Sequence, residues 1–149
     1  MIHLSKYEDI WTLRLDRPEK ANSLTLDMLE SISEVAQEAE GARALIITGT
    51  GKIFSAGADL EAVKTGLATS YIWEKVSNTI AGLSCFTIAA INGTLAGGAF
   101  GMALACDIRI TVPHAKFFYP VMKLGYMPQP SDPLRMTALM GASRTKMVL

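Results

Sequence analysis

Residues Thr87–Cys106 read TIAAINGTLAGGAFGMALAC and are almost wholly apolar. One interpretation is a membrane-spanning helix, because about 20 apolar residues cross a bilayer and small residues spaced by four mediate helix contacts there. The other is a buried strand, a turn and a buried helix. Asn92-Gly93 is a turn signal, Gly97-Gly98 disfavours one continuous helix, and no basic cluster flanks the stretch. These features favour the strand–turn–helix and predict no membrane segment.

The same alternation extends in both directions along the chain. The patterns predict strands over Ile10–Asp16, Ala44–Thr48, Phe86–Ile91 and Cys106–Val112. They predict helices over Thr25–Glu40 with Thr25 as cap, through Tyr71–Ile80, over Gly98–Ala105, over Ser131–Met140, and again from Ser143 to Leu149. Because its apolar run is continuous, Ala44–Thr48 is expected to be covered on both faces. Alternating strands and helices indicate an α/β layer fold, and the length of 149 residues indicates one domain over 1–149.

The composition excludes several classes of protein. Half of the residues are apolar and 19% are charged, so the chain can bury a core and is not a disordered segment. Lys plus Arg (14) equals Asp plus Glu (14), which gives no field of one sign for binding nucleic acid. Cys85 and Cys106 have neither a disulfide pattern nor metal-ligand spacing. We expect buried free thiols, no metal, and a reducing compartment such as the cytoplasm.

Two turns of small residues each follow a predicted strand. The first is FSAGADL at residues 54–60, and the second is NGTLAGG at residues 92–98. Small residues let a ligand approach the backbone, and free N–H groups at the next helix start then point toward it. Two such turns on neighbouring strands can direct one N–H each at a single oxygen, which makes an oxyanion hole. The alternative is that these glycines only permit tight packing of helix on sheet.

Three segments carry a resemblance to a known family: RPEKANSL at residues 17–24, FSAGADL at 54–60, and AAING at 89–93 running through Gly97-Gly98 to CDI at 106–108. Together they resemble the crotonase (enoyl-CoA hydratase/isomerase) superfamily. The resemblance implies a spiral of ββα units, acyl-CoA thioester substrates of fatty acid metabolism, and a homotrimer that often pairs into a hexamer. Coenzyme A would enter as part of the substrate, with no separate cofactor. Since the last helical pattern stops at Leu149, we expect this to be an N-terminal core whose C-terminal helices are missing.

The resemblance also assigns roles to individual residues. Ala58 and Gly98 match the positions whose backbone N–H groups hold the thioester oxygen. Four residues match positions that contact the CoA portion: Lys20, Ser23, Lys52 and Ala56. Without the neighbouring motifs, Lys20 and Lys52 would read as ordinary solvated charges.

The sequence departs from the family pattern at two positions. Gly101 and Val121 stand where the hydratases carry their two catalytic glutamates. Hydration of an enoyl thioester needs a base to activate water and an acid to protonate carbon, and glycine and valine can do neither. We therefore expect no efficient enoyl-CoA hydratase activity, and we expect glutamate restored at both positions to raise hydration.

Three other residues are candidates for the missing chemistry. Asp132 lies in a region where some relatives place a catalytic aspartate, although a few residues off the expected position. Its alternative role is a cap in the first turn of the helix at Ser131-Asp132-Pro133. Tyr119 and Tyr126 bracket the lost glutamate at Val121, and they are expected to line an acyl pocket or to donate a proton.

Two functions therefore stay open. The first is an acyl-CoA enzyme of the lyase, isomerase or hydrolase class that stabilises an enolate or oxyanion. The second is a catalytically silent acyl-CoA-binding or assembly subunit.

Overall fold

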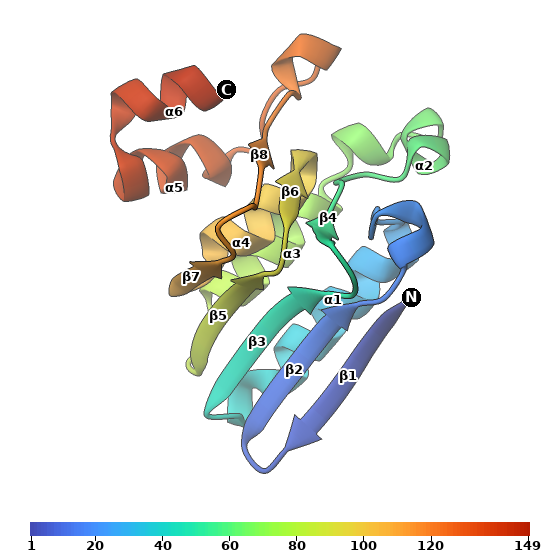
Figure 1. Cartoon of the computed structure of the whole chain (residues 1–149), viewed down its shortest axis with the longest axis vertical. Helices are drawn as coiled ribbons and strands as arrows, with labels where there is room; N and C mark the ends of the chain where they lie inside the picture. The colour runs from blue at the N-terminus through green and yellow to red at the C-terminus, as the bar shows by residue number, and fades with distance from the viewer.

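Five strands form the larger sheet, in the order β1-β2-β3-β5-β7 (Figure 1). They are β1 (Ile2–Tyr7), β2 (Ile10–Leu15), β3 (Ala44–Gly49), β5 (Phe86–Ile91) and β7 (Ile108–Thr111). In this computed structural model, which describes all 149 residues, β1 and β2 form an antiparallel hairpin and the other neighbours are parallel. Parallel neighbours require crossover connections, and helices supply them here.

Three short parallel strands form a second sheet, in the order β4-β6-β8. They are β4 (Ile53–Ser55), β6 (Thr94–Ala96) and β8 (Phe117–Phe118). Each follows a strand of the larger sheet, as β4 follows β3, β6 follows β5 and β8 follows β7. Because helices come after each such pair, the chain repeats a ββα unit. This confirms the predicted α/β spiral.

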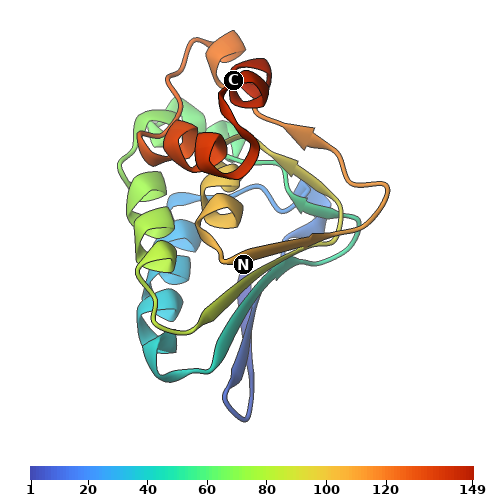
Figure 2. The same ribbon diagram turned by 90° about the vertical axis from the view of Figure 1, so that its left-hand side faces the viewer.

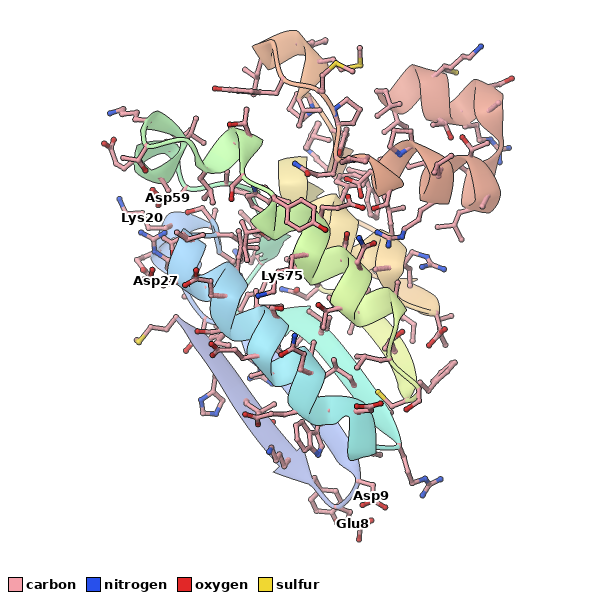
Figure 3. The ribbon with its side chains drawn as sticks, turned by 180° about the vertical axis from the view of Figure 1, so that it is seen from behind. Glu8, Asp9, Lys20, Asp27, Asp59 and Lys75 are labelled. Carbon is pink, nitrogen blue, oxygen red and sulfur yellow. The ribbon has the colours of Figure 1, made fainter.

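The six helices either cover one side of the larger sheet or lie beyond the ends of its strands (Figure 1 and Figure 2). They are α1 (Leu26–Glu38), α2 (Leu60–Lys64), α3 (Ile72–Ala81), α4 (Phe100–Ala105), α5 (Ser131–Met140) and α6 (Ala142–Val148). Figure 3 shows α1 and α3 side by side over the sheet. Thr25 caps α1 as predicted, since its side chain accepts a hydrogen bond from Met28 N.

Strand β3 corrects one expectation. Leu45 and Ile47 are buried under the helices, whereas Ile46 and Thr48 on the opposite face are only half-buried. The predicted cover on both faces is therefore wrong. The reason is that α1 and α3 both pack on the same face, and a continuous apolar run does not show how many faces are covered.

The apolar stretch Thr87–Cys106 contains β5, β6 and α4, with a 3-10 turn at Gly97–Ala99 before α4. No helix of the structure has the length and apolar character needed to span a membrane. The strand predicted from Cys106 begins only at Ile108, because Cys106 ends α4 and the Asp107 carboxylate accepts hydrogen bonds from the N–H and hydroxyl of Thr87 (2.7 and 2.8 Å). Both cysteines are buried and free, and burial raises the pKa of Cys106 to about 12.

Candidate active site

The two glycine turns lie in direct contact. Gly57 and Gly97 both have left-handed backbone (φ +89° and +55°), which favours glycine. A Cβ on Gly57 would stand 2.8 Å from the carbonyl oxygen of Ala96 and 3.3 Å from the Cα of Gly97. Parallel pairing of β4 with β6 brings the turns together. Glycine is thus required for the close approach of one turn to the other.

The segment Ala21–Leu24 holds the first turn from outside. Ala56 N donates to Ala21 O (3.0 Å), Leu24 N donates to Gly57 O (2.7 Å), and Asp59 N donates to Leu24 O (2.9 Å). These bonds use the backbone on either side of Ala58 but not its own N–H, which has no acceptor within the chain. An unpaired backbone donor at a turn is available to a ligand oxygen.

Asn22 ties this segment to the strands. Its side chain is fully buried; Oδ1 accepts from Arg17 N (2.8 Å), and Nδ2 donates to the carbonyl oxygens of Ile53 (2.7 Å) and Thr50 (2.9 Å). All of its strong hydrogen-bonding directions are used within the fold. Asn22 therefore supports the turn rather than a ligand.

An ion pair fixes the residue after Ala58. Arg17 Nη1 lies 2.7 Å from Asp59 Oδ2, and Asp59 also accepts from the N–H groups of Glu61 and Ala62 at the start of α2. The hydrogen bond from Arg17, followed by that from Ala62, holds the pKa of Asp59 below its usual value. Ser23 joins this cluster, since its hydroxyl lies 3.3 Å from Arg17 Nη1 and 3.4 Å from Asp59 Oδ2.

The second turn leads into a helix against an aromatic wall. Gly98 lies in the 3-10 turn before α4, where the leading N–H groups have no acceptor within the helix. A Cβ on Gly98 would stand 3.0–3.1 Å from the ring of Trp73, so the indole packs on the glycine backbone. Trp73 Nε1 donates to Leu67 O (2.7 Å), which fixes the ring.

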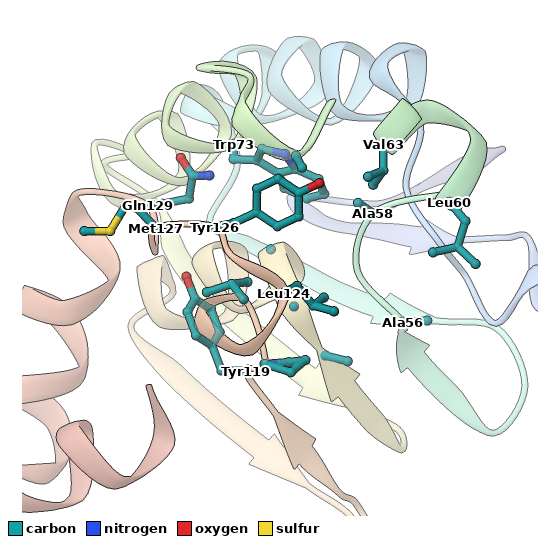
Figure 4. Close-up of a pocket in the computed structure, with 16 residues that line it drawn as sticks. Ala56, Ala58, Leu60, Val63, Trp73, Tyr119, Leu124, Tyr126, Met127 and Gln129 are labelled. Carbon is teal, nitrogen blue, oxygen red and sulfur yellow. The ribbon is translucent and has the colours of Figure 1, made fainter. Parts of the chain in front are cut away.

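A cavity of about 350 Å³ opens between these turns and the segment after β8 (Figure 4). Twelve of its sixteen lining residues are hydrophobic. Six of the residues singled out from the sequence line it: Ala56, Ala58, Gly98, Tyr119, Val121 and Tyr126. The cavity has the mostly apolar, concave form typical of a small-molecule site.

Three of the four residues predicted to contact the CoA portion lie outside this cavity. Lys20 and Lys52 are exposed on the surface. Ser23 is directed to Arg17 and Asp59 as described above. No group of three His, Cys, Asp or Glu side chains is placed to hold a metal ion.

Asp132 lies behind the cavity wall opposite the turns. It is fully buried, and Tyr119 Oη donates to its Oδ2 at 2.5 Å, while Oδ1 has no hydrogen-bond partner. Burial raises the pKa of Asp132 to about 6, although the Tyr119 hydrogen bond acts in the opposite direction. Burial, together with the charge of Asp132, also raises the pKa of Tyr119. A tyrosine of the cavity wall is thus coupled to a buried carboxyl group.

The interpretation of Asp132 as a helix cap is wrong. Helix α5 begins at Ser131 with Pro130 as N-cap, and the side chain that accepts from Ser131 N is that of Glu74 (3.3 Å), not that of Asp132. The Asp132 carboxyl turns inward to Tyr119, and the Ser131 hydroxyl donates to Glu74 Oε2 (3.0 Å) on α3. The Ser-Asp-Pro pattern predicted the helix start correctly. Both polar side chains, however, form hydrogen bonds with residues of other elements instead of capping the helix.

A family model described as Enoyl-CoA hydratase/isomerase matches residues 5–149. The chain belongs to this family.

Its relatives agree with the match. The chain is 31% identical over 157 residues to the Mycobacterium leprae protein named "Probable enoyl-CoA hydratase echA6", covering 100% of this chain and 63% of that protein. It is 31% identical over 156 residues to 4-chlorobenzoyl coenzyme A dehalogenase-1 of Arthrobacter sp., covering 96% and 56% of the two chains. A solved enoyl-CoA hydratase from Bacillus anthracis is 30% identical with a TM-score of 0.87, covering 99% of this chain and 61% of that one. This chain thus spans about three-fifths of the length of these relatives.

This member of the enoyl-CoA hydratase/isomerase family has no carboxylate in its cavity lining. Gly101 is buried in α4, and a Cβ placed there would stand 3.2 Å from Asp132 Oδ1 and 3.4 Å from Ser77 Cβ. That glutamates at 101 and 121 would raise hydration stays a prediction. Because a side chain at 101 would crowd the Asp132 carboxyl group, the variant that tests it should also carry Asp132→Ala.

Sequence reasoning missed part of the cavity of this family member. Trp73, Leu124, Met127 and Gln129 line it without having been singled out. Trp73 carries an apolar helix signal that any core residue would give, and the segment 122–129 has no clear period. Only the Gly98–Trp73 contact and the path of the chain after β8 place these side chains at the cavity.

Proposed function

We propose that this chain binds acyl-CoA thioesters and that the N–H groups of Ala58 and Gly98 hold the thioester oxygen. One observation carries the proposal: the two glycine turns touch at one apolar cavity, which both residues line. Negative charge develops on a thioester oxygen when an enolate or tetrahedral intermediate forms. Fixed amide donors in a dry site stabilise such charge by about 3–4 kcal/mol per donor.

The surroundings of the cavity support this ligand. Its apolar walls suit an acyl chain, and Lys20 and Lys52 are free at the surface to contact the anionic CoA portion, as would Ser23 and Ala56 in the resemblance. Coenzyme A would belong to the substrate, with no separate cofactor. From the same resemblance we propose a homotrimer or hexamer acting in the cytoplasm or another reducing compartment.

The reaction we propose is enolate or oxyanion chemistry of the lyase, isomerase or hydrolase class, without efficient hydration. Gly101 and Val121 place no acid or base at the family positions, and each such loss reduces a rate by about 10²–10⁴. We expect crotonyl-CoA hydration far below the ordinary enzymatic rate of about 10 s⁻¹.

A second candidate is a catalytically silent acyl-CoA-binding or assembly subunit. The cavity lining favours it, since the polar side chains there are neutral and none is a carboxylate. Under this alternative the oxyanion hole would serve recognition alone.

Calorimetric titration with butyryl-CoA and with its thioether analogue, which lacks the carbonyl, tests the proposed contact. Two net hydrogen bonds at about 0.5–1.5 kcal/mol each predict roughly 5- to 160-fold tighter binding of the thioester. In Gly98→Pro, which lacks one N–H, this preference should shrink. Equal affinity of the unsubstituted chain for both ligands would mean that no oxyanion hole operates. Crotonyl-CoA turnover at an ordinary enzymatic rate would contradict the missing hydration.

A further inference from the structure

The buried carboxyl group of Asp132 lies where a side chain on Gly101 would point. Its Oδ1 is 3.2 Å from the position of a Cβ at Gly101, and its own helix is α5, not α4. The space that a glutamate at 101 would need is therefore filled by a carboxyl group from another element. Glycine at 101 is what makes room for it.

Stability alone does not account for this carboxyl group. It caps no helix, and it makes no salt bridge, because Arg135 donates instead to Ser131 and Asn78 (2.7 and 2.8 Å). One of its oxygens is buried without a partner. A buried acceptor without a hydrogen-bond partner reduces the stability of the fold, and more so when it is charged. Buried polar groups that reduce stability are expected at functional sites.

Tyr119 connects Asp132 to the cavity. The tyrosine lines the cavity, and its hydroxyl donates to Asp132 Oδ2. Its ring is held edge to face by Phe100, with centroids 5.1 Å apart and planes at 79°. In Figure 4 Tyr119 lies across the cavity from Ala56 and Ala58. A thioester bound at Ala58 and Gly98 would thus have Tyr119 on its opposite side.

We propose that Tyr119 and Asp132 form a proton relay that serves the acyl cavity in place of the missing glutamates. The inference rests on the proposed function. In the relay the α-carbon of the acyl group gives its proton to Tyr119 Oη as the Tyr119 hydroxyl proton passes to Asp132 Oδ2. The C–H electron pair becomes the enolate, whose oxygen the Ala58 and Gly98 N–H groups hold. Reversal returns the proton to carbon, and tyrosine is neutral before and after each transfer.

The charges around the pair fit this direction of transfer. The pKa of Tyr119 is raised, which disfavours a free tyrosinate, whereas that of Asp132 is raised to about 6, so its ionised form can accept a proton near neutral pH. Two other charged groups act on Asp132: Glu74 on α3 raises its pKa and Arg135 on α5 lowers it. On α4, the uncharged Gly101 faces it.

Exchange of the α-protons of butyryl-CoA in D₂O, followed by NMR, tests the relay. The unsubstituted chain should exchange them at a rate that rises with pH and levels off above about pH 6. Tyr119→Phe and Asp132→Asn, which change little in volume, should each lose about 10²–10⁴-fold in rate while still binding butyryl-CoA. Asp132→Asn should also lose the pH dependence, which a merely structural role would not alter.

Matched controls lie in the β1–β2 hairpin. Tyr7 is 75% exposed and Asp9 is exposed in the turn, so Tyr7→Phe and Asp9→Asn should exchange at the unsubstituted rate. Thermal unfolding of all four variants verifies that each is folded.

Several results would overturn the relay and leave the proposed function standing. These are butyryl-CoA binding without α-proton exchange, undiminished exchange in Tyr119→Phe or Asp132→Asn, and a rate that is flat from pH 4.5 to 7.5 in the unsubstituted chain. The pH profile of the unsubstituted chain is informative even if a variant fails to fold. Absence of thioester binding would remove the proposed function itself.

Discussion

An aspartate lies next to each of the two walls of the cavity without lining it, and the two aspartates are in opposite environments. On the side of the glycine turns, Asp59 is paired with Arg17 at 2.7 Å and its pKa is lowered. On the other side, Asp132 has no cationic partner, one of its oxygens is unpaired, and its pKa is raised to about 6. The first carboxylate stabilises the turn that presents Ala58. The second has a pKa at which it can gain or lose a proton near neutral pH.

The walls also differ in what they offer a ligand. The turns at Ala58 and Gly98 offer backbone N–H groups, which depend on backbone path and not on side-chain identity. The wall of Tyr119, with Asp132 behind it, offers side chains. A side chain of a given chemistry can come from either of two elements when both elements reach the same space. At Gly101, a small residue on α4 faces the Asp132 carboxyl group from α5. In the proposed relay, this carboxyl group takes the part of a side chain on α4.

Among the remaining predictions, removing a backbone donor should have the largest effect. Gly98→Pro deletes one N–H, and we expect α-proton exchange of butyryl-CoA to fall by about 10²–10³-fold. The matched variant Gly98→Ala keeps the N–H but places a Cβ 3.0 Å from the Trp73 ring, so it should lose less. Comparable losses in both variants would assign the effect to packing and not to the donor.

Whether side chains at 101 and 132 compete for one space can be tested by a double-mutant cycle. Gly101→Glu should reduce the free energy of unfolding by about 3 kcal/mol, because it overpacks the site and adds a second buried carboxylate. Asp132→Ala in the same chain should recover much of that loss, which urea unfolding would measure. Additive effects would show that the two positions do not share one space.

The opposite pKa shifts of the two aspartates predict opposite pH dependences of stability. The folded chain binds the Asp132 proton more tightly than an unfolded aspartate of pKa about 3.9 does. Its stabilising contribution is therefore complete below about pH 4 and is lost as pH rises through about 6, a change of about 2–3 kcal/mol. Asp132→Asn should remove this decrease and gain stability relative to the unsubstituted chain between pH 4 and 7.

Asp59 gives the reverse sign, because its lowered pKa makes its contribution present above about pH 4 and lost as pH falls through the folded pKa. Asp59→Asn should therefore be less stable than the unsubstituted chain at neutral pH, with the difference shrinking in acid. Urea unfolding of both variants from pH 3.5 to 7.5 measures the two trends. Parallel trends for the two variants would contradict the contrast between the walls.

The sequence by itself determined the α/β order and the two glycine turns on which the proposed oxyanion hole rests. These features are local: a turn needs glycine where φ is positive, and a strand or helix shows its period within a few residues. Gly57 and Gly97, which both have positive φ, are examples of such a local requirement. The motif at 17–24 marked the family, although its buried Asn22 and its Arg17 prove to support the first turn from outside.

Only the tertiary structure decided the opposite wall. Trp73 packs on Gly98 from α3, and Asp132 reaches Gly101 from α5, so each contact joins residues that are far apart in the chain. The local pattern at Ser131-Asp132-Pro133 does not separate a helix cap from a partner of a buried tyrosine, because an aspartate serves in either role. The position of the Asp132 carboxyl group depends on the space beside Gly101 on α4 and on the hydrogen bond from the Tyr119 hydroxyl. The backbone half of the site follows from local conformation, whereas the side-chain half follows from which elements the fold packs together.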